Sequence, residues 1–294
     1  MSLLRPASAR DALYSAERLL ARRRVAEPRW SAQLLLEAAL GRHLAWLYAH
    51  PEEPLPAPAS RRFAAWVARR ARHEPVWYII GKAQFYGLEF AVNPSVLIPR
   101  HETELLVDCA LELAPFNTIA DACTGSGCVA VALAVHMPRA RILATDSSAA
   151  ALRLARRNAR LQGVAERITF LKGDWLQPLR EPVDLVVANP PYVSTHEMKR
   201  LPREVRCYEP AAALHAGPDG MAGISALLQQ APSRLKQGGS LIMEIAPQRA
   251  RRALSLAKRV VPAAAVELRT DYAGRSRLLL IRAITSESSR GSTR

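Results

Sequence analysis

Long apolar runs are missing from this sequence. None of its stretches approaches the roughly 18 to 20 apolar residues that a membrane-spanning helix needs. Residues 1–6 also lack the apolar centre of a secretory signal peptide. Hydrophobic residues make up 49% and charged residues 23% of the 294 residues, which is typical of a globular protein. We therefore expect a cytoplasmic protein with one large and one small domain, and no membrane partner.

Cysteine is also scarce. The four cysteines are Cys109, Cys123, Cys128 and Cys207. Their spacing fits neither a zinc-ligand pattern nor the disulfide framework of a small secreted chain. We expect free thiols in a reducing compartment and no metal site.

Acidic residues are few relative to basic ones. The chain has 26 Asp and Glu against 41 Lys and Arg, a formal net charge of +15. Arginines are dense in residues 22–24 and 61–72. They have two interpretations: solvated helix faces, or a surface that works close to RNA, for instance near the ribosome. Charge bears on partners and not on fold, and we expect no specific nucleic-acid partner.

The first 80 residues have a helical pattern. Leu13, Ala16 and Leu20 share one helical face, and residues 32–40 predict a second helix that Gly41 can end. Four prolines in residues 51–58 predict a loop, and a third helix opens near Phe63 and ends before Pro75. A helical bundle of this size is only marginally stable on its own, so we expect it to pack on another part of the chain.

The residue pattern of the remaining sequence changes at residue 84 and again at residue 117. Residues 84–98 combine strand formers with turn signals at Gly87 and Asn93-Pro94, which predicts a β-hairpin linker. From Asn117 strands alternate with helices, which predicts a doubly wound, largely parallel sheet of the α/β, Rossmann-like class. The expected divisions are a helical domain over residues 1–80, a linker over 81–99, a catalytic domain over 100–284 and a disordered tail over 285–294.

Polar residues follow several of the predicted strands. In an open α/β sheet, ligands bind beyond the carboxyl ends of the strands. The first such loop is residues 121–127, in which Gly125 and Gly127 permit a tight turn and a close ligand approach. It lacks the Lys-Ser/Thr of a phosphate loop and the full glycine spacing of a dinucleotide fingerprint. By itself it fits a purely structural turn equally well.

Two further strand ends suit a nucleoside. Asp146 can accept hydrogen bonds from both ribose hydroxyls, although it can also cap the following helix. Asp174 can accept from an adenine amino group, and the Trp175 ring can lie against the adenine face. The alternative for this pair is a surface turn with an interior tryptophan.

The sequence Asn189-Pro190-Pro191-Tyr192 ends the fourth strand and is the most specific signal. The two prolines fix the backbone direction and remove two N–H donors. The Asn189 side-chain oxygen and the Pro190 carbonyl can then accept both hydrogens of a planar NH2 group, with Tyr192 as an aromatic wall.

Methyl transfer to an amide nitrogen explains this choice of residues. An amide nitrogen is a poor nucleophile, whereas the sulfonium methyl group of S-adenosylmethionine is strongly electrophilic. Two acceptors on the N–H bonds add electron density to nitrogen and orient it, so catalysis is mostly positioning and electrostatic stabilisation. No strong general base is needed, and none is evident in the sequence.

Other polar residues have less specific interpretations. Glu209-Pro210 and residues 217–220 are typical of loops and can also shape a substrate channel. Glu244, at a strand end, and Arg275 form either an ion pair or part of the site.

Several stretches from end to end form a recognisable set. They are Arg69-Arg70-Ala71 with Glu74-Pro75, Tyr78-Ile79-Ile80-Gly81, Phe85-Tyr86-Gly87-Leu88, Val96-Leu97-Ile98-Pro99-Arg100 with Glu102-Thr103-Glu104, Asn189 to Tyr192, Glu204-Val205-Arg206 with Tyr208-Glu209-Pro210, Asp219-Gly220, and Asp271-Tyr272-Ala273-Gly274. This set resembles the protein-(glutamine-N5) methyltransferases, whose catalytic part is of the class I type. The resemblance covers about residues 10 to 282.

The resemblance implies an S-adenosylmethionine-dependent enzyme that methylates the glutamine of the Gly-Gly-Gln motif in peptide chain release factors, with S-adenosylhomocysteine as its product. It implies a helical domain that helps dock the release factor, a β-hairpin and a seven-stranded catalytic domain. The implied cofactor contacts are Cys123, Thr124, Gly125, Ser126, Gly127, Asp146, Asp174, Trp175 and Asn189. The implied substrate contacts are Asn189, Pro190, Pro191 and Tyr192, of which Asn189, Pro190 and Tyr192 are catalytic.

One departure from the family pattern concerns Cys123, which stands where these enzymes usually have the first glycine of the loop. The loop is closer to that of the sister enzyme that methylates ribosomal protein L3, whereas His101-Glu102-Thr103-Glu104 and both ends of the chain favour the release-factor enzyme.

Two alternatives remain at this point. An adenine-N6 methyltransferase of DNA or RNA would bind the exocyclic amine with the same Asn-Pro-Pro-Tyr sequence. A non-enzymatic ribosome-associated binding module would keep only the fold.

Overall fold

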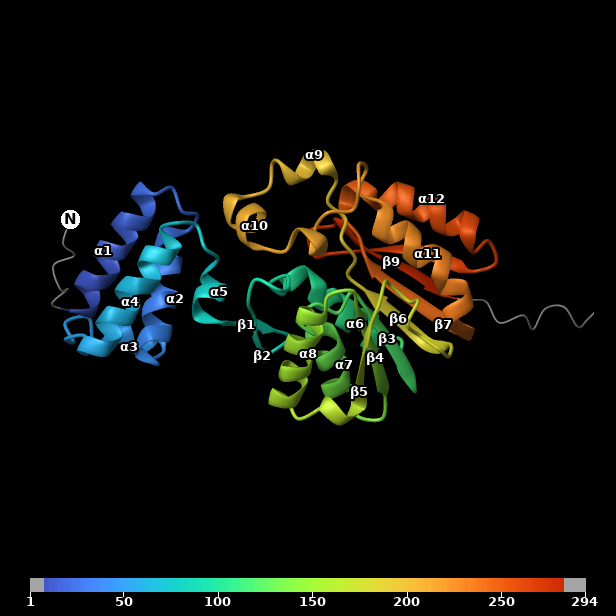
Figure 1. Ribbon diagram of the computed structural model, residues 1–294, viewed down its shortest axis with the longest axis horizontal. Coiled ribbons are helices and arrows are strands. Elements are labelled where there is room, and N and C mark those ends of the chain that lie inside the picture. Colours follow the sequence, from blue (N-terminus) through green and yellow to red (C-terminus); the bar gives the residue numbers. More distant parts are fainter. Residues whose placement is uncertain (1–7, 283–294) are drawn as a thin grey trace, which may run out of the picture. The chain divides into compact units, whose positions relative to one another are not determined.

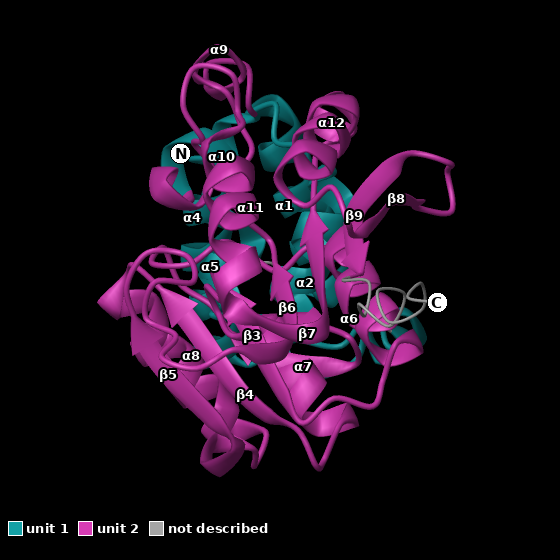
Figure 2. Ribbon diagram, turned by 90° about the vertical axis from the view of Figure 1, so that its right-hand side faces the viewer, with its two compact units in different colours: residues 1–82, 202–208 teal, residues 83–201, 209–294 magenta. Residues whose placement is uncertain are grey.

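The computed structural model describes residues 8–282, so the expected disorder of residues 285–294 lies outside the described part. The chain forms two compact units, one of residues 1–82 with 202–208 and one of residues 83–201 with 209–294 (Figures 1 and 2).

The first unit is helical. Its helices are α1 (Ala9–Arg22), α2 (Pro28–Leu40), α3 (Leu44–Ala49), α4 (Ala57–Arg70), α5 (Val76–Ile80) and α10 (Arg203–Tyr208). Ser8 caps α1 by accepting from the Asp11 backbone N–H at 3.2 Å, and Gly41 ends α2 in the left-handed conformation at φ 66°. The sequence does not predict α3 and α5, because helices of 6 and 5 residues show no periodicity.

The segment of residues 202–208 belongs to the helical unit although it follows the Asn-Pro-Pro-Tyr sequence. The Arg70 side chain is buried; its Nη1 pairs with Glu204 at 2.6 Å and its Nε donates to Ser31 at 3.1 Å. The Tyr208 hydroxyl donates to the Arg72 carbonyl at 2.9 Å. A buried arginine without its carboxylate partner is strongly destabilising, so this ion pair holds the segment in the unit.

The second unit begins with a β-hairpin. Strands β1 (Lys82–Phe85) and β2 (Leu88–Ala91) are joined by Tyr86 and Gly87, which both have positive φ, at 51° and 72°. Two residues with positive φ match the right-handed twist of paired strands. The hairpin is shorter than the sequence predicts, because residues 92–100 continue without regular structure.

The main sheet has seven strands in the order β5-β4-β3-β6-β7-β9-β8. They are β3 (Thr118–Ala122), β4 (Arg141–Asp146), β5 (Ile168–Lys172), β6 (Val183–Ala188), β7 (Leu235–Glu244), β8 (Ala265–Thr270) and β9 (Ser276–Arg282). Strands β3 to β7 pair in parallel, and β9 is antiparallel to both of its neighbours. The predicted class of largely parallel α/β sheet is confirmed.

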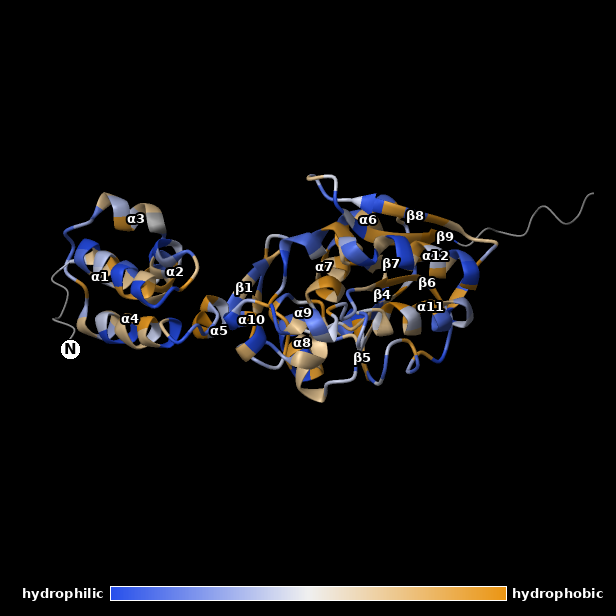
Figure 3. Cartoon of the chain, turned by 90° about the horizontal axis from the view of Figure 1, so that it is seen from above, coloured by the Kyte–Doolittle hydropathy of each residue, from blue (hydrophilic) through white to orange (hydrophobic). Residues whose placement is uncertain are grey.

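Helices cover both faces of this sheet. One face packs on α6 (Glu104–Glu112), α7 (Cys128–His136) and α8 (Ala149–Leu161), and the other on α11 (Ala222–Arg234) and α12 (Ala250–Val260). Successive residues of one strand enter opposite cores: Leu185 and Val187 face α6 and α7, whereas Val186 faces α11. Because these strands are buried on both faces, most of their residues are apolar. Figure 3 shows such residues in orange.

Asn158 connects α8 to the hairpin and to the first strand-end loop. Its side chain is fully buried, accepts from Ala91 N at 2.8 Å, and donates to the carbonyls of Ala91 at 3.0 Å and Ser126 at 2.8 Å. Replacing it with leucine leaves these backbone groups unsatisfied. We expect Asn158→Leu to lower the free energy of unfolding by about 2–5 kcal/mol in chemical denaturation. The exposed Asn117→Leu should change it by less than about 0.5 kcal/mol; equal effects would contradict this role.

Candidate active site

A cavity lies at the carboxyl ends of the parallel strands in the second unit. Strand order reverses between β3 and β6, which is where α/β sheets place their ligands. The cavity is lined by residues that follow β3, β4, β5 and β6, and by residues 95–100. Of the residues that the sequence singles out, those lining it are Cys123, Thr124, Gly125, Ser126, Asp146, Asp174, Trp175, Asn189 and Pro191; Gly127, Pro190 and Tyr192 belong to the same loops.

The loop after β3 is held by buried hydrogen bonds and by backbone in the left-handed region. Cys123, Gly125 and Gly127 have φ of 63°, 55° and 80°. A Cβ on Gly127 would lie 2.9 Å from the Ala155 Cβ of α8, so glycine permits this close packing of α7 on α8. Asp121, to which the sequence assigns no role, accepts from the Thr124 hydroxyl at 2.6 Å and from Ala130 N at 3.1 Å. Burial raises the pKa of Asp121 to about 7.

Asp146 ends β4 and connects two loops. One carboxylate oxygen accepts from Gly125 N at 2.9 Å and the other from Ser148 N at 2.8 Å. The cap of α8 is instead Ser148, whose hydroxyl accepts from Ala151 N at 3.2 Å. Burial raises the pKa of Asp146, and the two backbone hydrogen bonds oppose that shift. Each oxygen keeps lone pairs for a ligand in the cavity.

The turn after β5 positions Asp174 and Trp175. The Trp175 carbonyl accepts from the Thr145 hydroxyl at 2.6 Å, and Trp175 itself has a φ of 53°. Gln230 of α11 accepts from the Leu176 N–H at 2.9 Å. The turn is therefore fixed by neighbouring elements and is not a loose surface loop.

Glycines let the backbone pack tightly around the Asn-Pro-Pro-Tyr loop. A Cβ on Gly223 would lie 3.0 Å from Pro190, Pro191 and Trp175 atoms, so glycine favours the close approach of α11 to this loop. A Cβ on Gly220 would lie 2.5 Å from the Tyr192 carbonyl. The loop of residues 217–220 thus packs against the motif, which explains its glycine in physical terms.

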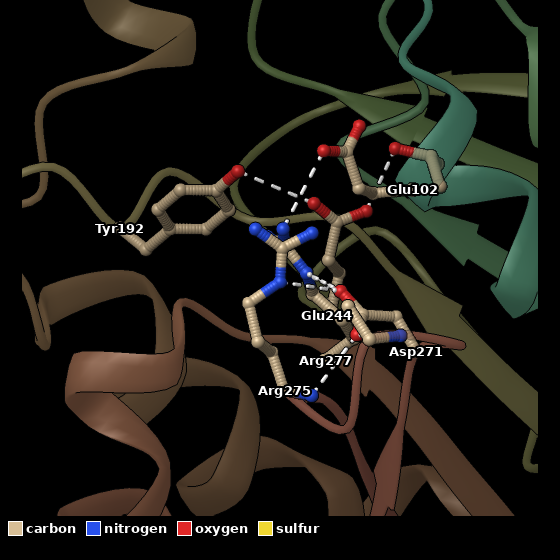
Figure 4. A network of polar contacts seen from close by, with 8 residues as sticks. Glu102, Tyr192, Glu244, Asp271, Arg275 and Arg277 are labelled. Atoms are coloured by element: carbon tan, nitrogen blue, oxygen red, sulfur yellow. Dashed lines mark hydrogen bonds and ion pairs between the residues drawn. The ribbon is translucent and has the colours of Figure 1, made fainter.

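Glu244 and Thr103 contact the motif. The sequence leaves Glu244 open between an ion pair and a part of the site, and it assigns no role to Thr103. The Asn189 Nδ2 donates to the Thr103 hydroxyl at 3.0 Å, and that hydroxyl donates to Glu244 at 2.7 Å. The Tyr192 hydroxyl donates to the other Glu244 oxygen at 3.2 Å (Figure 4). The sequence signal for a role of Glu244 is its position as a carboxylate at the end of β7, where a buried apolar strand meets the cavity edge.

Arg275 lies outside this set of contacts. It pairs with Asp271 at 2.9 Å, and Arg277 pairs with Asp271 at 3.0 Å and with Glu102 at 3.4 Å. Of the two roles open for Glu244, contact with the motif is therefore the one that the structure favours.

Glu209 fixes the cavity wall formed by residues 95–100. Its buried side chain pairs with Arg100 at 2.5 Å and accepts from Ile98 N at 3.3 Å. The Glu209-Pro210 pair is thus more than a loop signal, because Pro210 also lines the cavity. Within residues 8–282, no cluster of His, Cys, Asp and Glu suits a metal ion, and no helix there is long and apolar enough to cross a membrane.

Cys123 occupies a left-handed position that favours glycine. Burial and the nearby carboxylates of Asp146, Asp121 and Asp174 raise the pKa of its thiol well above the ordinary range, so the thiol stays protonated. Replacement by glycine relieves about 1–2 kcal/mol of backbone strain but also increases the entropy of the unfolded chain by about 0.4–1 kcal/mol.

We therefore expect Cys123→Gly to change the free energy of unfolding by less than about 2 kcal/mol and to retain turnover. Denaturation and a methyl-transfer assay measure both quantities. A tenfold loss of turnover would assign the thiol a function that this geometry does not give it.

Comparison with known proteins identifies the family. Residues 11–81 match the PrmC N-terminal domain, and residues 101–205 match the methyltransferase small domain. A release factor glutamine methyltransferase of Moorella thermoacetica is 44% identical over 92% of this chain and 97% of its own. The chain belongs to the release factor glutamine methyltransferase family. A second relative with that name, from Cereibacter sphaeroides, is 40% identical over 93% of this chain and 98% of its own.

Solved structures agree in fold. A methyltransferase from Pyrococcus furiosus is 15% identical with a TM-score of 0.52, over 76% of this chain and 100% of that chain. A 16S ribosomal RNA methyltransferase of T. thermophilus, in complex with AdoMet and guanosine, is 16% identical with a TM-score of 0.50, over 69% of this chain and 50% of that one. These likenesses concern the fold alone. Together with the family assignment, they identify this protein as a methyltransferase with the fold of the S-adenosylmethionine-dependent enzymes.

Proposed function

We propose that this protein methylates the side-chain amide nitrogen of the glutamine in the Gly-Gly-Gln motif of peptide chain release factors. Relatives of that name, 40–44% identical over nearly the whole chain, support the substrate. The observation that carries the chemistry is Asn189 at the cavity, with its Nδ2 bound to Thr103 and its oxygen left for a substrate NH2 group.

The residues that line the cavity fit S-adenosylmethionine. Three carboxyl groups, of Asp121, Asp146 and Asp174, line it with one guanidinium, of Arg100, which is already paired. Burial raises the pKa of Asp121 to about 7, so this group carries only part of a negative charge at neutral pH. Such a charge balance suits a cationic sulfonium nucleoside and opposes a phosphate. When bound, the cofactor supplies an electrophilic methyl group and leaves as S-adenosylhomocysteine.

The cofactor-holding residues in this proposal are Cys123 to Gly127, Asp146, Asp174, Trp175 and Asn189. Asp146 accepts from the ribose hydroxyls while its backbone partners hold it in place. Asp174 accepts from the adenine amino group, and the Trp175 ring covers the adenine face.

The substrate amide is held by Asn189, Pro190, Pro191 and Tyr192. The Asn189 side-chain oxygen and the Pro190 carbonyl accept the two N–H bonds, which turns the nitrogen lone pair toward the methyl donor. The Tyr192 phenol is no base: burial and Glu244 raise its pKa, so it stays protonated and serves as a wall. The nitrogen becomes acidic on methylation and would lose one proton to water, so no protein base is required. Positioning and electrostatic stabilisation supply the acceleration.

The remaining parts have supporting roles in this proposal. The helical domain of residues 1–80 docks the release factor in the cytoplasm, and residues 81–99 link it to the catalytic domain of residues 100–284. The arginine-dense residues 22–24 and 61–72 contact an acidic protein surface or RNA during docking, without sequence-specific binding of nucleic acid.

Incubation with cofactor labelled in its methyl group tests the substrate. Unmethylated release factor, ribosomal protein L3 and DNA are offered in parallel to the full chain. We expect incorporation into the release factor, and none into a release factor whose motif glutamine is replaced by alanine. Labelling of L3 alone would assign the protein to the sister activity, and labelling of DNA alone would refute a protein substrate.

A further inference from the structure

A chain of hydrogen bonds runs from the cavity into the protein interior. It passes from the Asn189 Nδ2 to the Thr103 hydroxyl at 3.0 Å, and from there to the Glu244 carboxylate at 2.7 Å. Glu244 also accepts from the Tyr192 hydroxyl at 3.2 Å, as Figure 4 shows. One buried carboxylate, 1% exposed, thus holds both ends of the Asn-Pro-Pro-Tyr motif.

The direction of these bonds follows from the donors available. An ionised carboxylate only accepts, so the single hydroxyl proton of Thr103 points to Glu244. Thr103 then offers only lone pairs to Asn189, whose NH2 group must face it. The opposite orientation would place the Asn189 oxygen against those lone pairs and lose a hydrogen bond.

We propose that Glu244, acting through Thr103, is a positioning residue that keeps the Asn189 oxygen toward the cavity. Among the described residues, no hydrogen bond occupies that oxygen. The site therefore accepts a substrate group that donates, such as an amide or amine NH2. It disfavours a group that only accepts, such as the carboxylate of glutamate at the same position.

Burial raises the pKa of Glu244 above its ordinary range, and the hydrogen bonds from Thr103 and Tyr192 act against this shift. Each of its oxygens already accepts from a hydroxyl, and the positive charge of Arg277 is close enough to stabilise the carboxylate. The nearby Glu102 carboxylate raises the pKa as well. Glu102 and Asp271 both pair with Arg277 and keep it in place.

Two substitutions of Thr103 separate the hydroxyl from the shape of the side chain. Thr103→Val keeps the shape and removes the hydroxyl, so we expect kcat for methyl transfer to release factor to fall about 10- to 100-fold. Thr103→Ser keeps the hydroxyl and should remain within about 3-fold of the wild type. A role in packing alone predicts the reverse order of these two variants.

Glu244→Gln tests whether Glu244 sets the orientation of the Asn189 side chain. The glutamine amide can accept only through its one oxygen, so it cannot bind both hydroxyls as acceptor and no longer fixes the direction of the Thr103 hydroxyl. We expect kcat to fall about tenfold or more while S-adenosylhomocysteine affinity by calorimetry stays the same. Thr169→Val and Glu112→Gln make the same chemical changes at exposed positions and should have no effect.

An NMR measurement tests the orientation without any substrate. The sequence has four asparagines, so 15N-asparagine labelling gives four side-chain NH2 groups. We expect one Asn189 proton to be protected from exchange in the wild type and in Thr103→Ser, and unprotected in Thr103→Val. The Asn158 NH2 group, bound to two carbonyls, is the internal reference.

The substrate preference in this inference rests on the proposed function, whereas the orientation of Asn189 does not. If the wild type methylates no release factor but Asn189 shows the expected protection, the proposed function fails and the orientation stands. Unprotected Asn189 in the wild type would overturn the inference even if release factor is methylated. So would full turnover of Thr103→Val.

Discussion

Replacing Asn189 with alanine is expected to lower kcat for methyl transfer to release factor by about 100- to 1000-fold, as the loss of a preorganised polar group in an active site does. The variant loses the oxygen that accepts from the substrate amide, together with the contact to Thr103. Affinity for S-adenosylhomocysteine should fall far less, because most proposed cofactor contacts lie on other strand ends. Single-turnover kinetics and calorimetry measure the two effects separately.

The matched control is Asn117→Ala. Asn117 is exposed and directly precedes β3, at the amino end of the strand and so at the edge of the sheet away from the cavity. It should keep wild-type turnover and affinity. Unchanged turnover in Asn189→Ala would refute the role of the motif, and equal loss of cofactor affinity and turnover would mean that Asn189 serves only to bind the cofactor.

Replacing Asp146 with alanine is expected to weaken S-adenosylhomocysteine binding by about 100-fold or more, since each hydrogen bond to a charged group contributes about 1.5–3 kcal/mol. The variant loses the proposed ribose contacts and also releases the N–H groups of Gly125 and Ser148. Calorimetry with the product measures the affinity, and turnover at saturating cofactor should recover in part.

Asp146→Asn separates these two contributions. Asparagine keeps one acceptor oxygen for a backbone N–H but loses the negative charge. Burial raises the pKa of Asp146, so ionisation costs stability, whereas asparagine leaves one of the two backbone N–H groups without an acceptor. These effects oppose each other, so the free energy of unfolding should stay within about 1–2 kcal/mol of the wild type near neutral pH. Glu181→Ala removes an exposed carboxylate and is the control. Wild-type affinity in Asp146→Ala would contradict the ribose role.

The sequence predicts the sheet and the position of its strand ends well. The apolar run of residues 185–188 coincides with the fully buried part of β6, because a strand buried on both faces favours consecutive apolar residues; Asp184, near the start of β6, is only half-buried. Asp146 and Asn189 can be expected to meet because parallel strands bring their carboxyl ends to one edge. Local patterns of this kind are visible in the residues themselves.

Contacts between residues that are far apart in the sequence cannot be predicted from such local patterns. Thr103 lies 141 positions from Glu244 and 86 from Asn189, and no periodicity connects them. Arg70 and Glu204 are 134 positions apart, so membership of residues 202–208 in the helical unit depends on tertiary structure alone. Functional positions of this kind are found only when hydrogen-bond donors and acceptors are traced in three dimensions.

Tandem mass spectrometry of release factors from cells with and without this protein tests the central claim most directly. The account predicts one methyl group on the side-chain nitrogen of the Gly-Gly-Gln glutamine in cells that have the protein, and an unmodified glutamine in cells that lack it. The wild-type gene should restore the methyl group and the Asn189→Ala variant should not. A fully methylated glutamine in cells without the protein would contradict the account.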